Sequence, residues 1–249
     1  MCARSADSAM PPLALLAGGR ATRLGAATER VPKSLLEVAG EPFIAHQLRL
    51  VAEQGIKDVV VCCGHLGSMI ADFVGDGERF GCRVRYSFDG SSALGTGGAI
   101  CNALPLLGPR FWVMYGDSYL TAEFVPALRA FEASGLAALM MVFRNEGLWD
   151  VSNVEFVDGK IVQYAKPARS LGMRHIDYGL GIYEAEAFEA WAILRPFDLS
   201  LVQSELIARG AMAGFEVRER FYEIGSHCGL AETDAFLRGP TTECGGVAF

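Results

Sequence analysis

The chain has 249 residues, and 22 Lys and Arg against 29 Asp and Glu give it a formal net charge of −7. Because 51% of the residues are hydrophobic and 20% are charged, the composition supplies a core and excludes disorder as the chain's main character. The acidic balance, without a basic run, argues against a nucleic-acid groove as the primary surface.

Residues 1–12 contain no long apolar stretch, so we expect a loose leader without a signal peptide or membrane span. From residue 13 to 150, short apolar runs alternate with amphipathic stretches. The apolar runs predict strands at 13–17, 58–63, 84–87, 111–115 and 137–143. The amphipathic stretches predict helices at 42–54, 68–74, 96–107 (broken near Pro105) and 122–134. This alternation predicts a Rossmann-like α/β fold with a mixed, mostly parallel sheet flanked by helices.

After residue 150 strand patterns outnumber helical ones. Residues 153–166 alternate around Asp158-Gly159, a pair typical of hairpin turns. A strand at 178–184, a helix at 199–209 and a last strand at 215–224 follow, and 238–249 have no periodicity and are expected to form a tail. The sequence therefore predicts a single domain over 13–237, with a first part at 13–150 and a smaller, β-rich part at 151–237.

Glycine is the unusual count, because 29 glycines exceed the usual share of about 7%. Several of them stand where predicted strands end, which is where ligands bind in an open α/β sheet. The first such segment, GGRATRLG at 18–25, offers glycine amides and two arginines to phosphate oxygens. It matches neither the P-loop nor the dinucleotide fingerprint. Alone it is also typical of a structural turn.

The longer run GGRATRLGAATERVPK at 18–33 resembles the signature of sugar-1-phosphate nucleotidylyltransferases. The resemblance continues in the family's order through LGTGGA (94–99), YGD (115–117), KP (166–167), GLGIY (179–183) and YEIGS (222–226). It implies the GT-A-like nucleotidyltransferase fold, with the nucleotide bound by 13–150 and the sugar phosphate by 151–237. It also implies a reaction in which a sugar 1-phosphate attacks the α-phosphorus of a nucleoside triphosphate and releases pyrophosphate.

The resemblance assigns roles residue by residue. The catalytic residues would be Arg23, Lys33 and Asp117. The nucleotide would be bound by Ala17, Gly18, Gly19, Arg20, Thr22, Asp89, Gly95 and Thr96. The sugar phosphate would be bound by Asn153, Lys166, Arg174, Asp177, Tyr178 and Gly181. Asp117 and Glu223 would hold Mg²⁺, an ion that suits one or two carboxylates plus phosphate oxygens. For Asp89, a cap of the following turn is an equally open role.

The charges of these residues suit the implied chemistry. The nucleophile is already an anion, so the protein has to align two polyanions and neutralise their repulsion rather than supply a base. At ~4 Å and an effective dielectric near 20, each pair of like charges costs ~4 kcal/mol, which Mg²⁺ and the basic side chains would offset. Three positions depart from the family pattern: Ala21 replaces a glycine, Ala165 an acidic residue, and Glu223 the more usual Asp.

A narrower resemblance concerns the substrates. LGTGGAI and the segments at 150–156, 173–181 and 221–225 are similar to D-glycero-α-D-manno-heptose 1-phosphate guanylyltransferases. That branch implies GTP, a heptose 1-phosphate, a cytoplasmic location and a role in capsule or lipopolysaccharide biosynthesis. Nucleic acid and membrane are not expected as partners, and a homodimer is left open.

Other functions remain open at this point. Within the enzyme class, the chain could be a uridylyl-, thymidylyl- or cytidylyltransferase acting on another sugar 1-phosphate or on a small phosphate or phosphonate. In another class, it could be a catalytically silent regulator that binds sugar nucleotides, although the retained Arg23, Lys33, Asp117 and Lys166 argue against this. A GT-A glycosyltransferase would be expected to carry a DxD motif where this chain has Asp117-Ser118-Tyr119.

Overall fold

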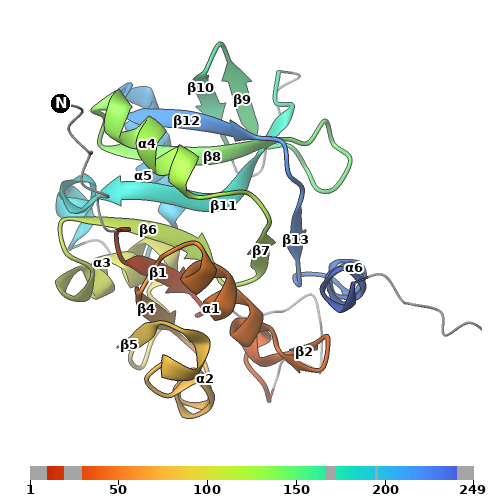
Figure 1. Ribbon diagram of the computed structural model, residues 1–249. Helices are drawn as coiled ribbons and strands as arrows, with labels where there is room; N and C mark the ends of the chain where they lie inside the picture. Colours follow the sequence, from red (N-terminus) through yellow and green to blue (C-terminus); the bar gives the residue numbers. More distant parts are fainter. Residues whose placement is uncertain (1–9, 20–29, 166–171, 194–195, 240–249) are drawn as a thin grey trace, which may run out of the picture.

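The computed structural model describes residues 10–19, 30–165, 172–193 and 196–239 (Figure 1). Within these ranges, nine strands form one sheet in the order β10-β9-β11-β6-β1-β4-β5, with β8 beside β11 and β12 beside β8. All of them except β10 and β11 run in the same direction. The predicted mixed, mostly parallel sheet is confirmed.

One side of the sheet consists of four neighbouring parallel strands: β1 (Leu13–Leu16), β4 (Asp58–Cys63), β5 (Arg83–Phe88) and β6 (Arg110–Tyr115). β1 lies between β4 and β6, and β5 pairs with β4. The bounds of β4 are the predicted ones, β1 and β6 differ from the prediction by one residue at one end, and β5 is one residue longer at both ends. Continuous apolar runs are typical of parallel strands covered on both faces, which is why these strands were predictable.

Helices cover both faces of this sheet (Figure 1). One core cluster joins the sheet to α1 (Phe43–Glu53), α2 (Gly67–Val74) and α4 (Val125–Ser134). The other joins it to α3 (Gly95–Leu107) and α5 (Leu199–Ala208). The predicted break near Pro105 is wrong, because α3 continues to Leu107 with the proline inside its last turn. None of the helices in the described ranges has the length and apolar character that crossing a bilayer would require.

The later strands extend the same sheet. They are β8 (Ala138–Arg144), β9 (Val154–Val157), β10 (Lys160–Tyr164), β11 (His175–Glu184) and β12 (Met212–Val217). The predicted hairpin is confirmed, since β9 and β10 pair antiparallel across Asp158 and Gly159. β11 lies between β6 and β8 and runs antiparallel to both. Strands from both predicted parts therefore share one sheet.

The prediction of one strand at 215–224 is wrong. The chain leaves the large sheet after Val217, passes through the polar Arg-Glu-Arg at 218–220, and forms β13 (Phe221–Glu223), which pairs with β7 (Ser118–Leu120). The sequence reading also missed α6 (His227–Arg238), which is capped where Ser226 accepts a hydrogen bond from Gly229 N–H. Residues 1–9 of the expected leader and 240–249 of the expected tail lie outside the described residues.

Short elements complete the edge of the molecule where β7, β13 and α6 lie (Figure 1). These are the 3-10 helix η2 (Lys33–Leu35) and the hairpin of β2 (Glu37–Val38) with β3 (Glu41–Pro42). Asp234 of α6 accepts a hydrogen bond of 2.7 Å from Ala39 N–H in the hairpin turn. Two further 3-10 helices are η3 (Glu78–Phe80) and η4 (Ala185–Trp191).

Candidate active site

A pocket of about 190 Å³ opens at the carboxyl ends of β1 and β6. It is bordered by the end of β1, by η2, by the start of α3 and by the end of β6. Five of its residues carry a predicted role: Ala17, Gly19, Lys33, Thr96 and Asp117. Four others had been assigned none: Leu16, Ser34, Tyr115 and Gly116.

Glycines allow the backbone segments around this pocket to lie close together. Gly116 N–H donates to the Leu16 carbonyl at 3.0 Å, and a Cβ at position 116 would overlap that oxygen. A Cβ on Gly18 would lie 3.0 Å from Gly64 N, tighter than ordinary packing, whereas one on Gly19 would meet none of the described residues within 4 Å. Gly18 and Gly116 thus allow close packing of the backbone, and the described residues leave the backbone of Gly19 uncovered where a ligand can approach.

Lys33 and Asp117 form an ion pair in this pocket. The distance from Lys33 Nζ to Asp117 Oδ2 is 2.7 Å, and the two side chains are 15% and 41% exposed. Ser118 Oγ donates to the other carboxylate oxygen at 3.3 Å. The sequence thus brings together a lysine from the first loop and an aspartate that follows β6, 84 positions later.

Gln47, which sequence reasoning missed, fixes the turn that carries Asp117. Its fully buried Nε2 donates to the carbonyls of Tyr115 (3.1 Å) and Ser118 (2.8 Å), on either side of Gly116-Asp117. Because both partners are acceptors, only the NH₂ end of the amide can face them. A glutamine within the apolar face of the predicted 42–54 helix was the available signal.

Glu223 reaches the same corner through the pairing of β13 with β7. It is the register partner of Ser118, and the next residue, Ile224, donates its N–H to Asp117 O at 2.9 Å. The Glu223 carboxylate accepts hydrogen bonds from Ser226 Oγ at 2.8 Å and from Gly225 N–H. A Cβ on Gly225 would lie 3.1 Å from Lys33 Nζ and would overlap Glu223 Oε2. Lys33, Asp117 and Glu223 therefore gather around Gly225.

Two carboxylates in one corner are a donor set that can hold a divalent cation. Mg²⁺ takes one or two carboxylates and completes its coordination with water and phosphate oxygens. Asp117 is accessible to such an ion, since 41% of its side chain is exposed. Among the described residues, no group of three or more His, Cys, Asp or Glu side chains could hold a metal.

Of the predicted nucleotide-binding residues beyond β1, Thr96 is among the lining residues of the pocket, and Gly95 and Asp89 are not. Thr96 lines the pocket, and its Oγ1 accepts a hydrogen bond of 2.8 Å from Leu199 N–H. Gly95 has a φ of +72° and packs against the backbone of Phe197, where a side chain would overlap the carbonyl oxygen. Asp89 accepts from Leu94 N–H at 3.1 Å. Asp89 thus has the geometry of a turn cap.

Two of the predicted sugar-phosphate residues lie beside the pocket wall. Asp177 Oδ2 accepts hydrogen bonds from Tyr115 (3.3 Å) and Tyr164 (3.4 Å), and Asn153 Oδ1 accepts from Asp177 N–H at 2.9 Å. Burial raises the pKa of Tyr115 well above its usual value, and the charge of Asp177 adds to that rise. Burial, and then Asp177, raise the pKa of Tyr164 in the same way. Both hydroxyls therefore stay protonated and donate to Asp177.

Three other predicted sugar-phosphate residues do not reach the pocket. Tyr178 is buried on the opposite face of the sheet, where its hydroxyl accepts from Thr121 and Ala122 N–H at 3.1 Å. Gly181 lies inside the sheet, where a Cβ would be 2.9 Å from the Leu139 carbonyl oxygen. Arg174 is exposed just before β11. Four predicted residues lie outside the described ranges: Arg20, Thr22, Arg23 and Lys166.

The chain is similar to proteins of known class. A family model described as nucleotidyl transferase matches residues 14–192. An N-acetylmuramate alpha-1-phosphate uridylyltransferase of Neisseria meningitidis serogroup B is 30% identical over 227 residues, covering 89% of this chain and 96% of that protein. A D-glycero-alpha-D-manno-heptose 1-phosphate guanylyltransferase of Campylobacter jejuni is 30% identical over 109 residues, covering 44% of this chain and 48% of that protein.

The fold is also similar to solved structures. The structure of a Bacillus anthracis protein described as a glucose-1-phosphate thymidylyltransferase, in complex with sucrose, aligns with a TM-score of 0.83 at 21% identity. The alignment covers 93% of this chain and 96% of that one. At this identity the likeness is one of fold.

Proposed function

The chain belongs to the nucleotidyl transferase family, and we propose that it transfers a nucleotidyl group from a nucleoside triphosphate to a sugar 1-phosphate, with release of pyrophosphate. The observation that carries this proposal is the corner where Lys33 pairs with Asp117 next to Glu223, beside the glycine-lined end of β1. Two reacting polyanions require positive charge and alignment; Lys33 supplies the first directly, and the two carboxylates can supply it by holding a divalent cation.

Each group in this corner has a defined part in the proposed reaction. The backbone at Gly18 and Gly19 would receive the triphosphate, and Lys33 would neutralise phosphate charge as the α-phosphorus is attacked. Asp117 and Glu223 would hold Mg²⁺, which when bound supplies further positive charge to the phosphate oxygens. Gln47 keeps the Asp117 turn in place, so the carboxylate needs no rearrangement during the reaction. By resemblance, Arg23 would add charge on the triphosphate side and Lys166 on the sugar-phosphate side.

Two substrate pairs follow from the relatives. UTP with N-acetylmuramate 1-phosphate is the first candidate, because the Neisseria enzyme with that name aligns over 96% of its own length. GTP with D-glycero-α-D-manno-heptose 1-phosphate, the pair that the sequence motifs imply, is the second, and the Campylobacter relative supports it over 44% of this chain. Either pair would place the reaction in the cytoplasm, where nucleoside triphosphates are made.

A substrate panel tests this function. The purified protein is incubated with Mg²⁺, one of UTP, GTP, CTP or dTTP, and the 1-phosphate of N-acetylmuramate, heptose, mannose or glucose, and pyrophosphate release is measured. We expect release that requires triphosphate, sugar phosphate and metal together, and that is fastest with UTP and N-acetylmuramate 1-phosphate. Fastest release with GTP and the heptose would select the second pair. If no combination releases pyrophosphate but nucleotides still bind, the protein is a binder and the proposed function is wrong.

A further inference from the structure

The ammonium of Lys33 donates a hydrogen bond to Asp117, the residue proposed to hold the metal. Lys33 Nζ is 2.7 Å from Asp117 Oδ2, and 85% of the lysine side chain is shielded, since only 15% is exposed. The other oxygen of Asp117 accepts a hydrogen bond from Ser118 Oγ. In the free protein, the carboxylate thus already has a cation on one oxygen and a hydroxyl on the other.

The chain around Lys33 makes room for this arrangement. Lys33 begins η2, directly before the buried Ser34, and Gly225 faces its ammonium from the opposite segment. A Cβ at position 225 would lie 3.1 Å from Nζ, closer than ordinary packing. Gly225 does not have a positive φ, so its neighbours, and not its backbone conformation, require glycine. The fold therefore keeps a place for the ammonium beside Asp117.

Resting on the proposed function, we propose that Lys33 and the divalent cation compete for Asp117 in the free protein, and that the triphosphate ends this competition. A metal on Oδ2 would meet the positive charge of Lys33 at a few ångströms, which opposes its binding. Phosphate oxygens give Lys33 another anionic partner and give the metal the additional ligands that Mg²⁺ needs. The metal then binds together with the nucleotide rather than before it.

This competition makes the two ligands cooperative. A triphosphate that draws Lys33 away from Asp117 raises the affinity of the site for the metal, and by linkage the metal raises the affinity for the triphosphate by the same factor. Lys33 therefore has two parts: it neutralises phosphate charge, and it keeps the metal site weak until the nucleotide is present.

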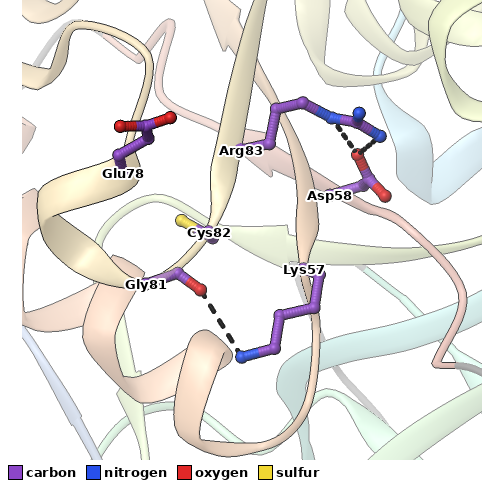
Figure 2. Close-up of a pocket in the computed structure, with 6 residues that line it drawn as sticks. All are labelled: Lys57, Asp58, Glu78, Gly81, Cys82 and Arg83. Carbon is purple, nitrogen blue, oxygen red and sulfur yellow. Dashed lines mark hydrogen bonds and ion pairs between the residues drawn. The ribbon is translucent and has the colours of Figure 1, made fainter.

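Direct metal binding tests the proposal without any substrate. Mn²⁺ is titrated into the protein in the absence of nucleotide, and free Mn²⁺ is followed by electron paramagnetic resonance. We expect Lys33→Met to bind Mn²⁺ at least about fivefold more tightly than the wild type, while its pyrophosphate release falls. Lys33→Arg, which keeps the charge, should bind as weakly as the wild type. Lys57→Met removes a lysine that directly precedes β4 and lines a different pocket (Figure 2), and it should change neither quantity.

The outcomes separate this inference from the proposed function. Unchanged or weaker Mn²⁺ binding by Lys33→Met, or equal tightening in Lys57→Met, would overturn the competition. Tighter binding by Lys33→Met, together with failure of every substrate pair, would keep the competition and reject the transferase. Adding Asp117→Asn to Lys33→Met should abolish the gain in Mn²⁺ affinity, which would show that the added Mn²⁺ affinity depends on Asp117. Thermal unfolding confirms that each variant is folded, and Lys33→Gln replaces Lys33→Met if the latter is not.

Discussion

The two ends of the neighbouring parallel strands β6, β1, β4 and β5 carry hollows that differ in size and in chemistry. At the amino ends of β4 and β5, a hollow of about 460 Å³ is lined by Lys57, Asp58, Glu78, Gly81, Cys82 and Arg83 (Figure 2). At the carboxyl ends of β1 and β6, the pocket with Lys33 and Asp117 measures about 190 Å³. The smaller one is the candidate active site, so volume is not what distinguishes it.

What distinguishes the two is where their residues come from and what they do. The amino-end hollow is built from residues 57–83, and its charges pair on the surface: Asp58 with Arg83, whose side chain is 72% exposed, and Lys57 with the Gly81 carbonyl at 3.5 Å. Burial raises the pKa of Cys82 to about 11, so its thiol stays protonated. The carboxyl-end pocket instead joins β1, η2, α3 and β6. A site that collects distant segments has to be maintained by the whole fold.

The largest expected effect is at the carboxyl end. Asp117→Asn should reduce turnover at least ~100-fold, because it removes the charge on which both Lys33 and the proposed metal depend. The matched control is Asp58→Asn at the amino end, which should leave turnover within a factor of about two. Initial rates of pyrophosphate release check both variants. A near-normal rate for Asp117→Asn would show that neither hollow contributes a carboxylate that turnover requires.

Gln47→Leu should have the next largest effect. It leaves the buried carbonyls of Tyr115 and Ser118 without their donor, which costs about 1–3 kcal/mol of stability, and it loosens the Asp117 turn. We expect about a tenfold loss of turnover and a higher Mg²⁺ requirement. Gln54→Leu, at the residue that follows the end of α1, is the control, because Gln54 Oε1 accepts a hydrogen bond from Phe124 N–H, away from the pocket. Equal Mg²⁺ dependence in the two variants would reduce Gln47 to a structural role.

A smaller effect is expected at Asp89. Burial raises its pKa and the hydrogen bond from Leu94 N–H opposes that rise, so ionisation at neutral pH costs the folded state some stability. Asp89→Asn keeps an acceptor for Leu94 and should raise the melting temperature slightly at pH 7. The gain should disappear below about pH 4, where Asp89 is protonated in both states. If the same variant loses nucleotide affinity at unchanged stability, Asp89 contacts the base instead of serving only as a cap.

The smallest effect is expected for Arg83→Ala, which removes an exposed ion pair with Asp58. Such pairs contribute about 0–1 kcal/mol, and turnover should not change. Urea unfolding together with the pyrophosphate assay measures both. A clear loss of turnover would show that the amino-end hollow affects the reaction.

The sequence predicted only part of the fold and of the candidate site. The physical reasons for the rest differ between residues. The apolar runs locate β1, β4 and β6, and two residues that follow β1 and β6 within two positions, Ala17 and Asp117, line the pocket as expected. Tyr178 was assigned by resemblance together with Asp177, which it directly follows on β11. Successive residues of a strand point to opposite faces, so the side chain of Tyr178 lies on the face away from Asp177. Gln47 acts through two backbone carbonyls, which no side-chain motif records.

The antiparallel insertion of β11 determines when the sheet can form. Among the described strands, β8 pairs only with β11 and β12, and both follow it in the sequence. During synthesis, Ala138–Arg144 therefore leaves the ribosome as an apolar strand without a partner and stays so until at least 31 further residues, Asn145–His175, have followed. Unpaired apolar strands are the segments from which nascent chains aggregate. Slowed elongation just after β8 should therefore lower the yield of folded protein more than a pause after β12.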